Sequence, residues 1–68
     1  MSVILYTTHC PQCIVLSNIL KDNNIEYKEV TDVEIMRKKG FLSVPRVEVD
    51  GKIMTMKETM DWIKEINA

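Results

Sequence analysis

The sequence predicts an α/β fold with the element order β-α-β-α-β-β-α. A strand, a helix and a second strand fit within about the first thirty residues, and a short second helix follows them. Further on, an Asp-Gly pair lies between two apolar runs, which indicates an antiparallel hairpin. The strand–helix–strand unit predicts a right-handed crossover between two parallel strands. With 68 residues, the chain is expected to form one domain, residues 1–68.

The first strand is predicted at Val3–Tyr6, a continuous apolar run of the kind buried on both faces of a parallel sheet. The first helix begins at the cysteines and ends at Asn23 and Asn24, because asparagine tolerates the left-handed conformation that ends many helices. Its apolar face has the i, i+3, i+4 spacing: Leu16, Ile19 and Leu20. The alternation from Ile25 to Val30 predicts the second strand.

Two capping-box patterns predict the starts of the remaining helices. Thr31 and Glu34 open a short helix that ends at Gly40, with Val33 and Met36 expected to point inward. The hairpin strands follow at Arg46–Val49 and around Ile53-Met54, joined by Asp50-Gly51. Thr55 and Glu58 then open the last helix, whose predicted apolar face is Met56, Met60, Ile63 and Ile66.

Composition and charge exclude several classes of protein. Hydrophobic residues make up 46% of the chain, which is too many for a disordered segment. The formal net charge is −1, without the basic stripe of a nucleic-acid binder. No apolar run approaches the roughly 20 residues that span a bilayer, and the N-terminal residues lack the features of a signal peptide. We therefore expect a monomeric, cytoplasmic protein that binds neither nucleic acid nor membrane.

The only two cysteines, Cys10 and Cys13, lie where the first helix is predicted to begin. If Cys10 is the N-cap, Pro11 occupies the first helical position, where its missing N–H costs nothing. The Cys10 sulfur then meets free backbone N–H groups and the positive end of the helix dipole. Both favour a thiolate, so the pKa of Cys10 is expected below about 8.5. Cys10 is predicted to attack a disulfide, and the more shielded Cys13 to resolve the mixed disulfide.

Other roles for the two cysteines follow from general chemistry. A structural disulfide across so short a loop would stabilise by only about 2 kcal/mol and would not persist in a reducing cytosol. A zinc site needs four ligands, so zinc or an iron–sulfur cluster would require ligands from a second chain or molecule. A metal- or cluster-binding dimer is the alternative class, and a redox-silent adaptor is a third. We expect no bound cofactor and no metal site within one chain.

Three separated motifs resemble the glutaredoxins and the small glutaredoxin-like electron donors of ribonucleotide reductase. The motifs are Val3-Ile-Leu-Tyr-Thr with Cys10-Pro-Gln-Cys13, then Gly40-Phe-Leu-Ser-Val-Pro45, then Val49-Asp-Gly51. The resemblance runs nearly end to end and implies a thioredoxin fold, with a four-stranded mixed sheet flanked by three helices. It implies that Cys10 is the nucleophile, that Cys13 resolves, and that the two form a redox-active disulfide. It also implies a cis Val44–Pro45 bond beside the cysteines, which leaves the Val44 backbone free to pair with substrate.

The resemblance leaves the electron donor open. Glutathione-using members have Tyr where this chain has Gln12, and Gly-Gly before an acidic pair where it has Thr55-Met56 and Lys57-Glu58-Thr59. Glutathione as a reducing co-substrate and a flavoprotein reductase are both expected donors, and disulfide-containing proteins, ribonucleotide reductase among them, are the expected substrates. For His9 and Arg37 a purely solvated role is the alternative. The implied substrate or glutathione contacts are His9, Pro11, Gln12, Arg37, Val44, Pro45, Met56, Lys57, Glu58 and Thr59.

Overall fold

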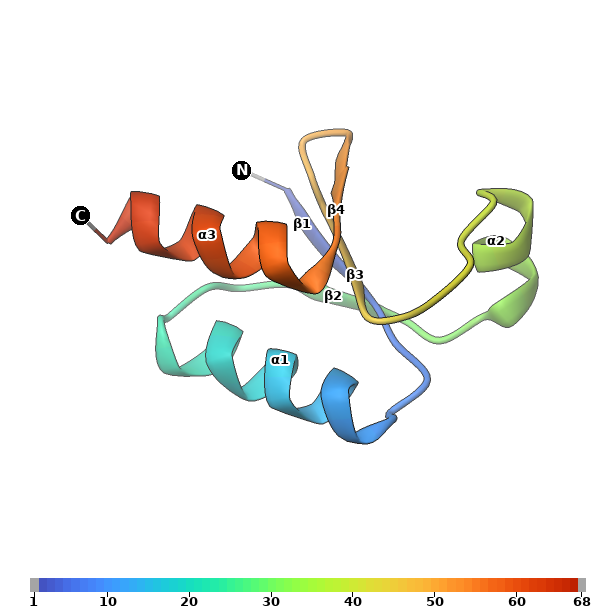
Figure 1. The fold of residues 1–68 in the computed structure, drawn as a ribbon, viewed down its shortest axis with the longest axis horizontal. Coiled ribbons are helices and arrows are strands. Elements are labelled where there is room, and N and C mark those ends of the chain that lie inside the picture. The colour runs from blue at the N-terminus through green and yellow to red at the C-terminus, as the bar shows by residue number, and fades with distance from the viewer. Residues whose placement is uncertain (1, 68) are drawn as a thin grey trace.

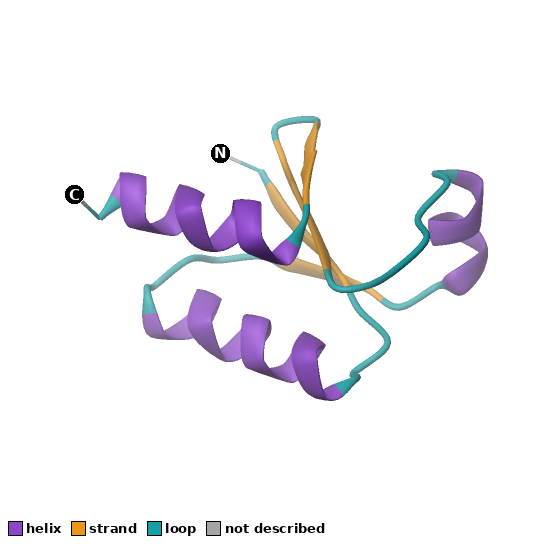
Figure 2. Cartoon of the chain, in the orientation of Figure 1, coloured by secondary structure: helices purple, strands orange, loops and turns teal. Residues whose placement is uncertain are grey.

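The computed structural model describes residues 2–67, and its helices and strands follow the predicted order (Figures 1 and 2). None of the helices in this part of the chain has the length and hydrophobicity needed to cross a membrane. The elements are β1 (Val3–Tyr6), α1 (Pro11–Asp22), β2 (Lys28–Val30), α2 (Val33–Lys38), β3 (Arg46–Val49), β4 (Lys52–Met54) and α3 (Met56–Ile66).

The strands form one mixed sheet in the order β2-β1-β3-β4. β1 is parallel to β2 and antiparallel to β3, and β3 and β4 form an antiparallel hairpin. The hairpin turn has positive φ at both central residues, 48° at Asp50 and 90° at Gly51, as a type I′ turn requires. α1 and α3 lie together on one side of the sheet, and α2 lies beyond its other side (Figure 1). The predicted thioredoxin-type sheet and its three helices are confirmed.

The main hydrophobic core lies between the sheet and the pair α1 and α3. Successive side chains of a strand point to opposite faces, so Val3 and Leu5 of β1 join this core while Tyr6 points to the other face. The buried residues of the core are Val3, Leu5, Leu16, Leu20, Ile25, Val47, Met54 and Ile63. The apolar face predicted for the first helix therefore supplies the core residues of α1.

A smaller contact region holds the α2 side against the sheet. The rings of Tyr6 and Phe41 meet edge to face, with centroids 5.0 Å apart. The Tyr6 hydroxyl donates a hydrogen bond to Glu48 Oε1 over 3.0 Å, and Lys39 Nζ lies 3.5 Å from the same oxygen. Lys39 also lies 5.8 Å from the centroid of the Tyr6 ring. These contacts join the end of α2, the loop that follows it, and strands β1 and β3.

The second strand is shorter than predicted, because β2 begins at Lys28 rather than at Ile25. The chain is still closing α1 at that point. Asn24 has the left-handed φ of 58°, and the Ile25 N–H donates to the Leu20 carbonyl over 3.0 Å. Ile25 is buried in the core, which explains why its apolar character resembled that of a strand residue.

The start of α2 was predicted one residue too early. Asp32, not Thr31, is the N-cap, and its carboxylate accepts a hydrogen bond from the Glu34 N–H over 2.9 Å. Met36 is the one buried residue of this helix, whereas Val33 is exposed. The prediction that Val33 points inward is therefore wrong.

The last helix begins as predicted, with the complete capping box at Thr55. Its buried face is rotated from the predicted one. Thr59 and Ile63 are buried, while Met60 and Ile66 are exposed. The buried position on this face is therefore Thr59, whereas the pattern of apolar residues predicted Met60.

Candidate active site

Cys10 is the N-cap of α1, as the sequence predicts. Its backbone is extended, with φ −67° and ψ 165°, and its sulfur accepts a hydrogen bond from the Cys13 N–H over 3.2 Å. Pro11 occupies the first helical position, and the Ile14 N–H donates to the Cys10 carbonyl over 2.9 Å to begin the helix. A sulfur thus takes the place of the oxygen that usually accepts at an N-cap.

The two sulfurs differ in their access to solvent. Both cysteines are free thiols, and their Sγ atoms lie 2.6 Å apart in a hydrogen bond. Cys13 is 1% exposed and faces the interior, whereas Cys10 is only half-buried. A substrate disulfide can reach Cys10 but not Cys13, and Cys13 is close enough to attack the Cys10 sulfur of a mixed disulfide.

Cys13 is the cysteine of the pair whose pKa is lowered. Burial raises the pKa of the Cys13 thiol, but hydrogen bonding with Cys10, with the Thr7 hydroxyl and with the backbone of Thr8 and Cys10 lowers it to about 7. The sequence analysis had placed the lowered pKa on Cys10 instead. The hydrogen bond that the Cys10 thiol donates over 2.6 Å therefore stabilises the Cys13 thiolate.

Thr7 is a site residue that the sequence analysis did not identify. It follows β1 directly and is buried, and its N–H donates to the Val30 carbonyl over 3.0 Å. Its hydroxyl oxygen accepts a hydrogen bond from the His9 N–H over 2.9 Å. The hydroxyl therefore both orders the loop before Cys10 and helps to lower the pKa of Cys13. The one signal in the sequence was a threonine between an apolar strand and the cysteines.

His9 lies beside Cys10 but is paired elsewhere. Its backbone has a left-handed φ of 61°, and its Nε2 lies 2.6 Å from Glu29 Oε1 on β2. Both side chains are exposed. The alternative in which His9 stabilises the thiolate has no contact to support it within residues 2–67, and the histidine is engaged by a carboxylate rather than simply solvated.

The Val44–Pro45 peptide bond is cis, as the resemblance implied. Pro45 is buried, while Val44 is half-buried and lines a pocket together with Thr8, two residues before Cys10. Within residues 2–67, neither the N–H nor the carbonyl of Val44 has a backbone hydrogen-bond partner. The loop thus presents unpaired backbone groups next to the segment that leads into Cys10.

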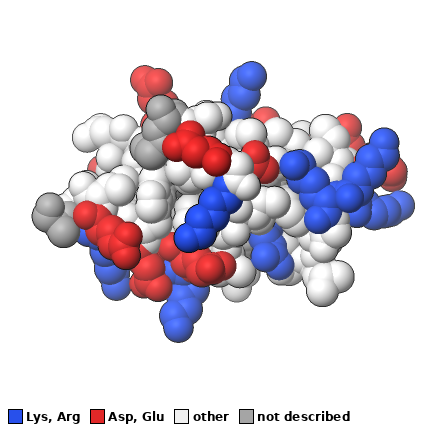
Figure 3. All heavy atoms as spheres, turned by 90° about the horizontal axis from the view of Figure 1, so that it is seen from above, with Lys and Arg blue, Asp and Glu red and all other residues white. Residues whose placement is uncertain are grey.

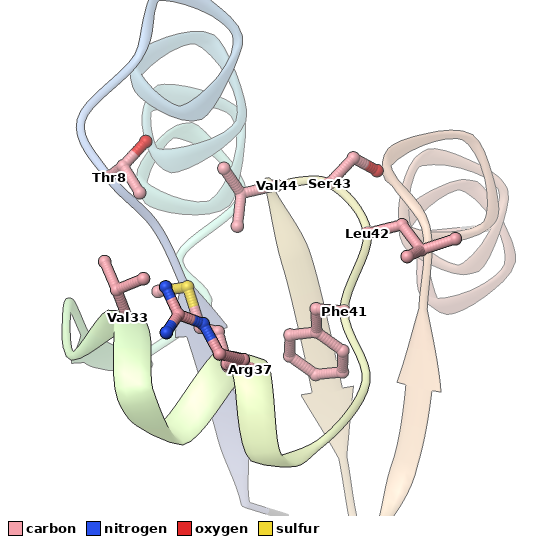
Figure 4. A pocket seen from close by; sticks show the side chains of 8 residues that line it. Thr8, Val33, Arg37, Phe41, Leu42, Ser43 and Val44 are labelled. Atoms are coloured by element: carbon pink, nitrogen blue, oxygen red, sulfur yellow. The ribbon is translucent and has the colours of Figure 1, made fainter.

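This pocket has a volume of about 230 Å³ and lies between α2, the loop that precedes Pro45 and the segment before Cys10 (Figure 4). Arg37 is the only ionisable residue that lines it. The full lining is Thr8, Val33, Met36, Arg37, Phe41, Leu42, Ser43 and Val44. Of the residues predicted to contact a ligand, Arg37 and Val44 are therefore brought to one cavity.

The start of α3 is less available to a ligand than the sequence analysis predicted. Thr59 is 0% exposed, and its hydroxyl donates to the Thr55 carbonyl over 2.8 Å, so its predicted contact with glutathione is wrong. The Glu58 carboxylate accepts from the Thr55 N–H over 3.1 Å, and this hydrogen bonding lowers the pKa of Glu58. Met56 packs against the core, and Lys57 and Glu58 are exposed.

Pro11 and Gln12 lie on the exposed first turn of α1, beside Cys10.

Charge is distributed unevenly over the surface of the molecule. Lys and Arg side chains gather at the end of the molecule where α2 lies, and acidic side chains are more frequent toward the opposite end (Figure 3). The basic residues of α2 and its C-cap are Arg37, Lys38 and Lys39. No group of three or more His, Cys, Asp or Glu residues within residues 2–67 is arranged to hold a metal ion.

The fold, with a Cys-x-x-Cys at a helix start and a cis-proline loop, is similar to that of solved thioredoxin-like proteins. A point mutant of the thioredoxin-like protein BC3987 matches with a TM-score of 0.74 and 24% identity, over 96% of each chain. BC3987 itself matches with a TM-score of 0.71 and 26% identity, over 91% of this chain and 99% of its own. No curated protein sequence matches this chain. The family model of glutaredoxin matches residues 3–54, and the chain belongs to the glutaredoxin family.

Proposed function

We propose that this protein is a dithiol oxidoreductase that reduces disulfides through Cys10 and Cys13. Membership of the glutaredoxin family supports a redox role. The observation that carries the finer proposal is the accessible Cys10 sulfur at the α1 N-cap, in contact with the buried Cys13 thiol. That geometry provides a nucleophile that substrates can reach and a second thiol that they cannot.

The reaction has two steps. The Cys10 thiolate attacks one sulfur of a substrate disulfide, forming a mixed disulfide and expelling the other substrate sulfur as a thiolate. Cys13, after giving up its proton, attacks the Cys10 sulfur, which breaks the mixed disulfide and releases the second substrate thiolate. Two electrons pass to the substrate, which takes up two protons. The protein is left with a Cys10–Cys13 disulfide.

A second reaction must return two electrons to this disulfide. The α3 start favours a flavoprotein reductase over glutathione as the donor. Thr59 is buried and Glu58 is bonded to the Thr55 N–H, so few groups of that helix start remain for a glutathione carboxylate. The cycle requires a compartment that keeps thiols reduced, for which we propose the cytoplasm.

A turnover assay tests the activity and its donor. Oxidised protein with a disulfide substrate is given NADPH and thioredoxin reductase, or NADPH, glutathione and glutathione reductase, and NADPH consumption is followed. The first system is expected to turn over, and Cys10→Ser is expected to abolish it. Cys13→Ser is expected to accumulate a mixed disulfide on Cys10, which mass spectrometry detects. Failure of both systems to consume NADPH would contradict the oxidoreductase assignment, and turnover with glutathione alone would contradict the proposed donor.

A further inference from the structure

We infer that His9 and Glu29 act as a pair that positions the Cys10 sulfur for the second step of the proposed reaction, in which Cys13 attacks it. The inference rests on the proposed dithiol activity and adds two residues that act through Cys10. They are positioning residues, because they hold the nucleophile and take no part in bond making. The backbone conformation of His9, its two anchors and the place of Cys10 in the fold each contribute to the inference.

His9 has an uncommon backbone conformation for a residue with a side chain. Its φ is 61°, in the left-handed region, and it immediately precedes Cys10. Residues other than glycine enter this region rarely, and they stay there where the surrounding structure holds them. The conformation of His9 sets the direction in which the chain enters α1. The extended N-cap geometry of Cys10, with φ −67° and ψ 165°, therefore depends on His9 remaining left-handed.

Two anchors hold His9 in this conformation. Its N–H donates to the hydroxyl oxygen of the buried Thr7 over 2.9 Å. Its side-chain Nε2 donates to Glu29 Oε1 over 2.6 Å. The Thr7 N–H in turn donates to the carbonyl of Val30, the neighbour of Glu29, over 3.0 Å. The segment before Cys10 is therefore attached to β2 twice, by the Thr7 backbone and by the His9 side chain.

Glu29 lies on the side of the sheet where α1 begins. It is opposite Leu5 in the parallel register of β1 and β2, and Leu5 points into the core that α1 covers (Figure 1). The side chains of His9 and Glu29 are 63% and 40% exposed. An exposed pair of this kind adds little to the free energy of unfolding. Its expected effect is therefore on the conformation of the segment before Cys10 and not on the stability of the fold.

The second step depends on the position of the Cys10 sulfur more than the first step does. Cys13 is 1% exposed within the fold, so its thiolate has one direction from which to reach the Cys10 sulfur, now 2.6 Å away. As the Cys13–Cys10 bond forms, the bond from Cys10 to the substrate breaks and the substrate thiolate leaves. Misplacing reacting atoms by about 1 Å can slow a reaction about 100-fold. In the first step, by contrast, the substrate is free to adjust its own approach to Cys10.

The test measures the two steps separately with hydroxyethyl disulfide, a small disulfide that offers few contacts beyond its sulfurs. Reduced protein is mixed with an excess of it, and samples quenched in acid are analysed by mass spectrometry. Formation of the mixed disulfide gives the rate of the first step, and its conversion to the Cys10–Cys13 disulfide gives the rate of the second. Glu29→Ala is expected to slow the second step about tenfold and the first by less than about twofold.

A conservative variant separates position from charge. Glu29→Gln keeps an oxygen that accepts from His9 Nε2 but removes the negative charge, so it is expected to keep the wild-type rate of the second step. If the carboxylate instead acted on the sulfurs through its charge, Glu29→Gln would be as slow as Glu29→Ala. Glu26→Ala is the matched control, because Glu26 is an exposed glutamate just before β2. It is expected to leave both steps unchanged.

A double-mutant cycle tests whether the two residues act as a pair. His9→Asn keeps a residue that tolerates the left-handed region, but its shorter side chain loses the hydrogen bond to Glu29. It is expected to slow the second step as much as Glu29→Ala, and the double variant is expected to be no slower than either single one. Circular dichroism melting should give midpoints within about 5 °C of the wild type for all variants, because the pair is exposed.

The outcomes separate this inference from the proposed function. An unchanged second step in Glu29→Ala or His9→Asn, a Glu29→Gln variant as slow as Glu29→Ala, or additive effects in the double variant would overturn the positioning role while the dithiol activity stands. If the wild-type protein forms neither the mixed disulfide nor the Cys10–Cys13 disulfide, the proposed activity itself is wrong, and the positioning role falls with it.

Discussion

At the scale of single residues, access separates the roles of the two cysteines. The Cys10 and Cys13 sulfurs are in contact, and the pKa that is lowered is that of the buried Cys13, so acidity by itself does not identify the nucleophile. Cys10 is the sulfur that solvent and substrate reach, because Cys13 lies one turn further along α1 on its buried face. Different backbone groups contact the two sulfurs: Cys10 accepts from the Cys13 N–H, and the backbone of Thr8 and Cys10 lowers the pKa of Cys13. Burial therefore decides which sulfur a substrate meets.

The ultraviolet absorbance of the thiolate in the reduced protein is expected to rise with pH around a first midpoint near 7. This midpoint is the pKa of Cys13, which burial raises and hydrogen bonding, chiefly with Cys10, lowers to about 7. Cys10→Ala removes that hydrogen bond and should move the Cys13 midpoint upward. The measurement is the thiolate absorbance at each pH.

Asn18→Ala is the control for this titration, since Asn18 is an exposed residue of the same helix. It should leave the midpoint where it is. A first wild-type midpoint at or above the free cysteine value of about 8.5 would contradict the lowering of the Cys13 pKa by these hydrogen bonds.

The sequence indicated the residues whose role follows from local backbone chemistry. Cys10 as N-cap with Pro11 behind it could be predicted, because helix starts have strong residue preferences. Thr7 and the pairing of His9 with Glu29 could not, because they depend on which strand ends meet across the sheet. Thr59 was misassigned because a threonine hydroxyl can bond to the carbonyl four residues earlier and enter a core.

At the scale of elements, the start of α2 shows how competing caps are resolved. Thr31 and Glu34 have capping-box spacing, but Asp32 lies between them and its carboxylate reaches the Glu34 N–H. Aspartate is at least as good an N-cap as threonine, and its charge also favours the positive end of the helix dipole. Sequence spacing alone does not rank two adjacent caps, which is why the boundary was one residue off.

Asp32→Ala is therefore expected to lower the free energy of unfolding by about 1 kcal/mol. Thr31→Ala is the matched control and is expected to change it by less than about 0.5 kcal/mol, as for an ordinary surface substitution. Urea titrations of the reduced proteins measure both differences. A larger loss for Thr31→Ala than for Asp32→Ala would show that the threonine caps the helix in solution.

At the scale of the whole molecule, the order of the elements and the hairpin could be predicted because periodicity and turn chemistry are local properties. Neither the pocket nor its lining could be predicted this way. Its wall combines α2 and the loop that follows it with Thr8, which is distant from both in sequence and meets them only through the placement of α2 across the sheet from α1 and α3. Phe41 and Tyr6 fix that placement by their ring contact.

A domain of this size has a small free energy of unfolding. Core residues that lie close to the cysteines therefore affect both this free energy and the active site. At about 0.05–0.15 kcal/mol per residue, 68 residues correspond to about 3–10 kcal/mol. Leu16 is fully buried three residues after Cys13, on the same face of α1. Leu16→Ala removes a filled core position and is expected to cost about 2–5 kcal/mol.

Leu16→Ala should therefore lower the thermal midpoint by about 10 °C or more, since 1 kcal/mol corresponds to about 4–8 °C in a domain of this size. It should also expose Cys13 to alkylation under native conditions, because local opening of α1 uncovers both positions. Val15→Ala is the control: Val15 precedes Leu16 on the same helix and is exposed, so neither quantity should change much. Circular dichroism melting and Cys13 alkylation by mass spectrometry give the two readouts. If Leu16→Ala lowers the melting midpoint but leaves Cys13 protected, the burial of the resolving thiol is maintained by the sheet and Thr7 rather than by the packing of α1.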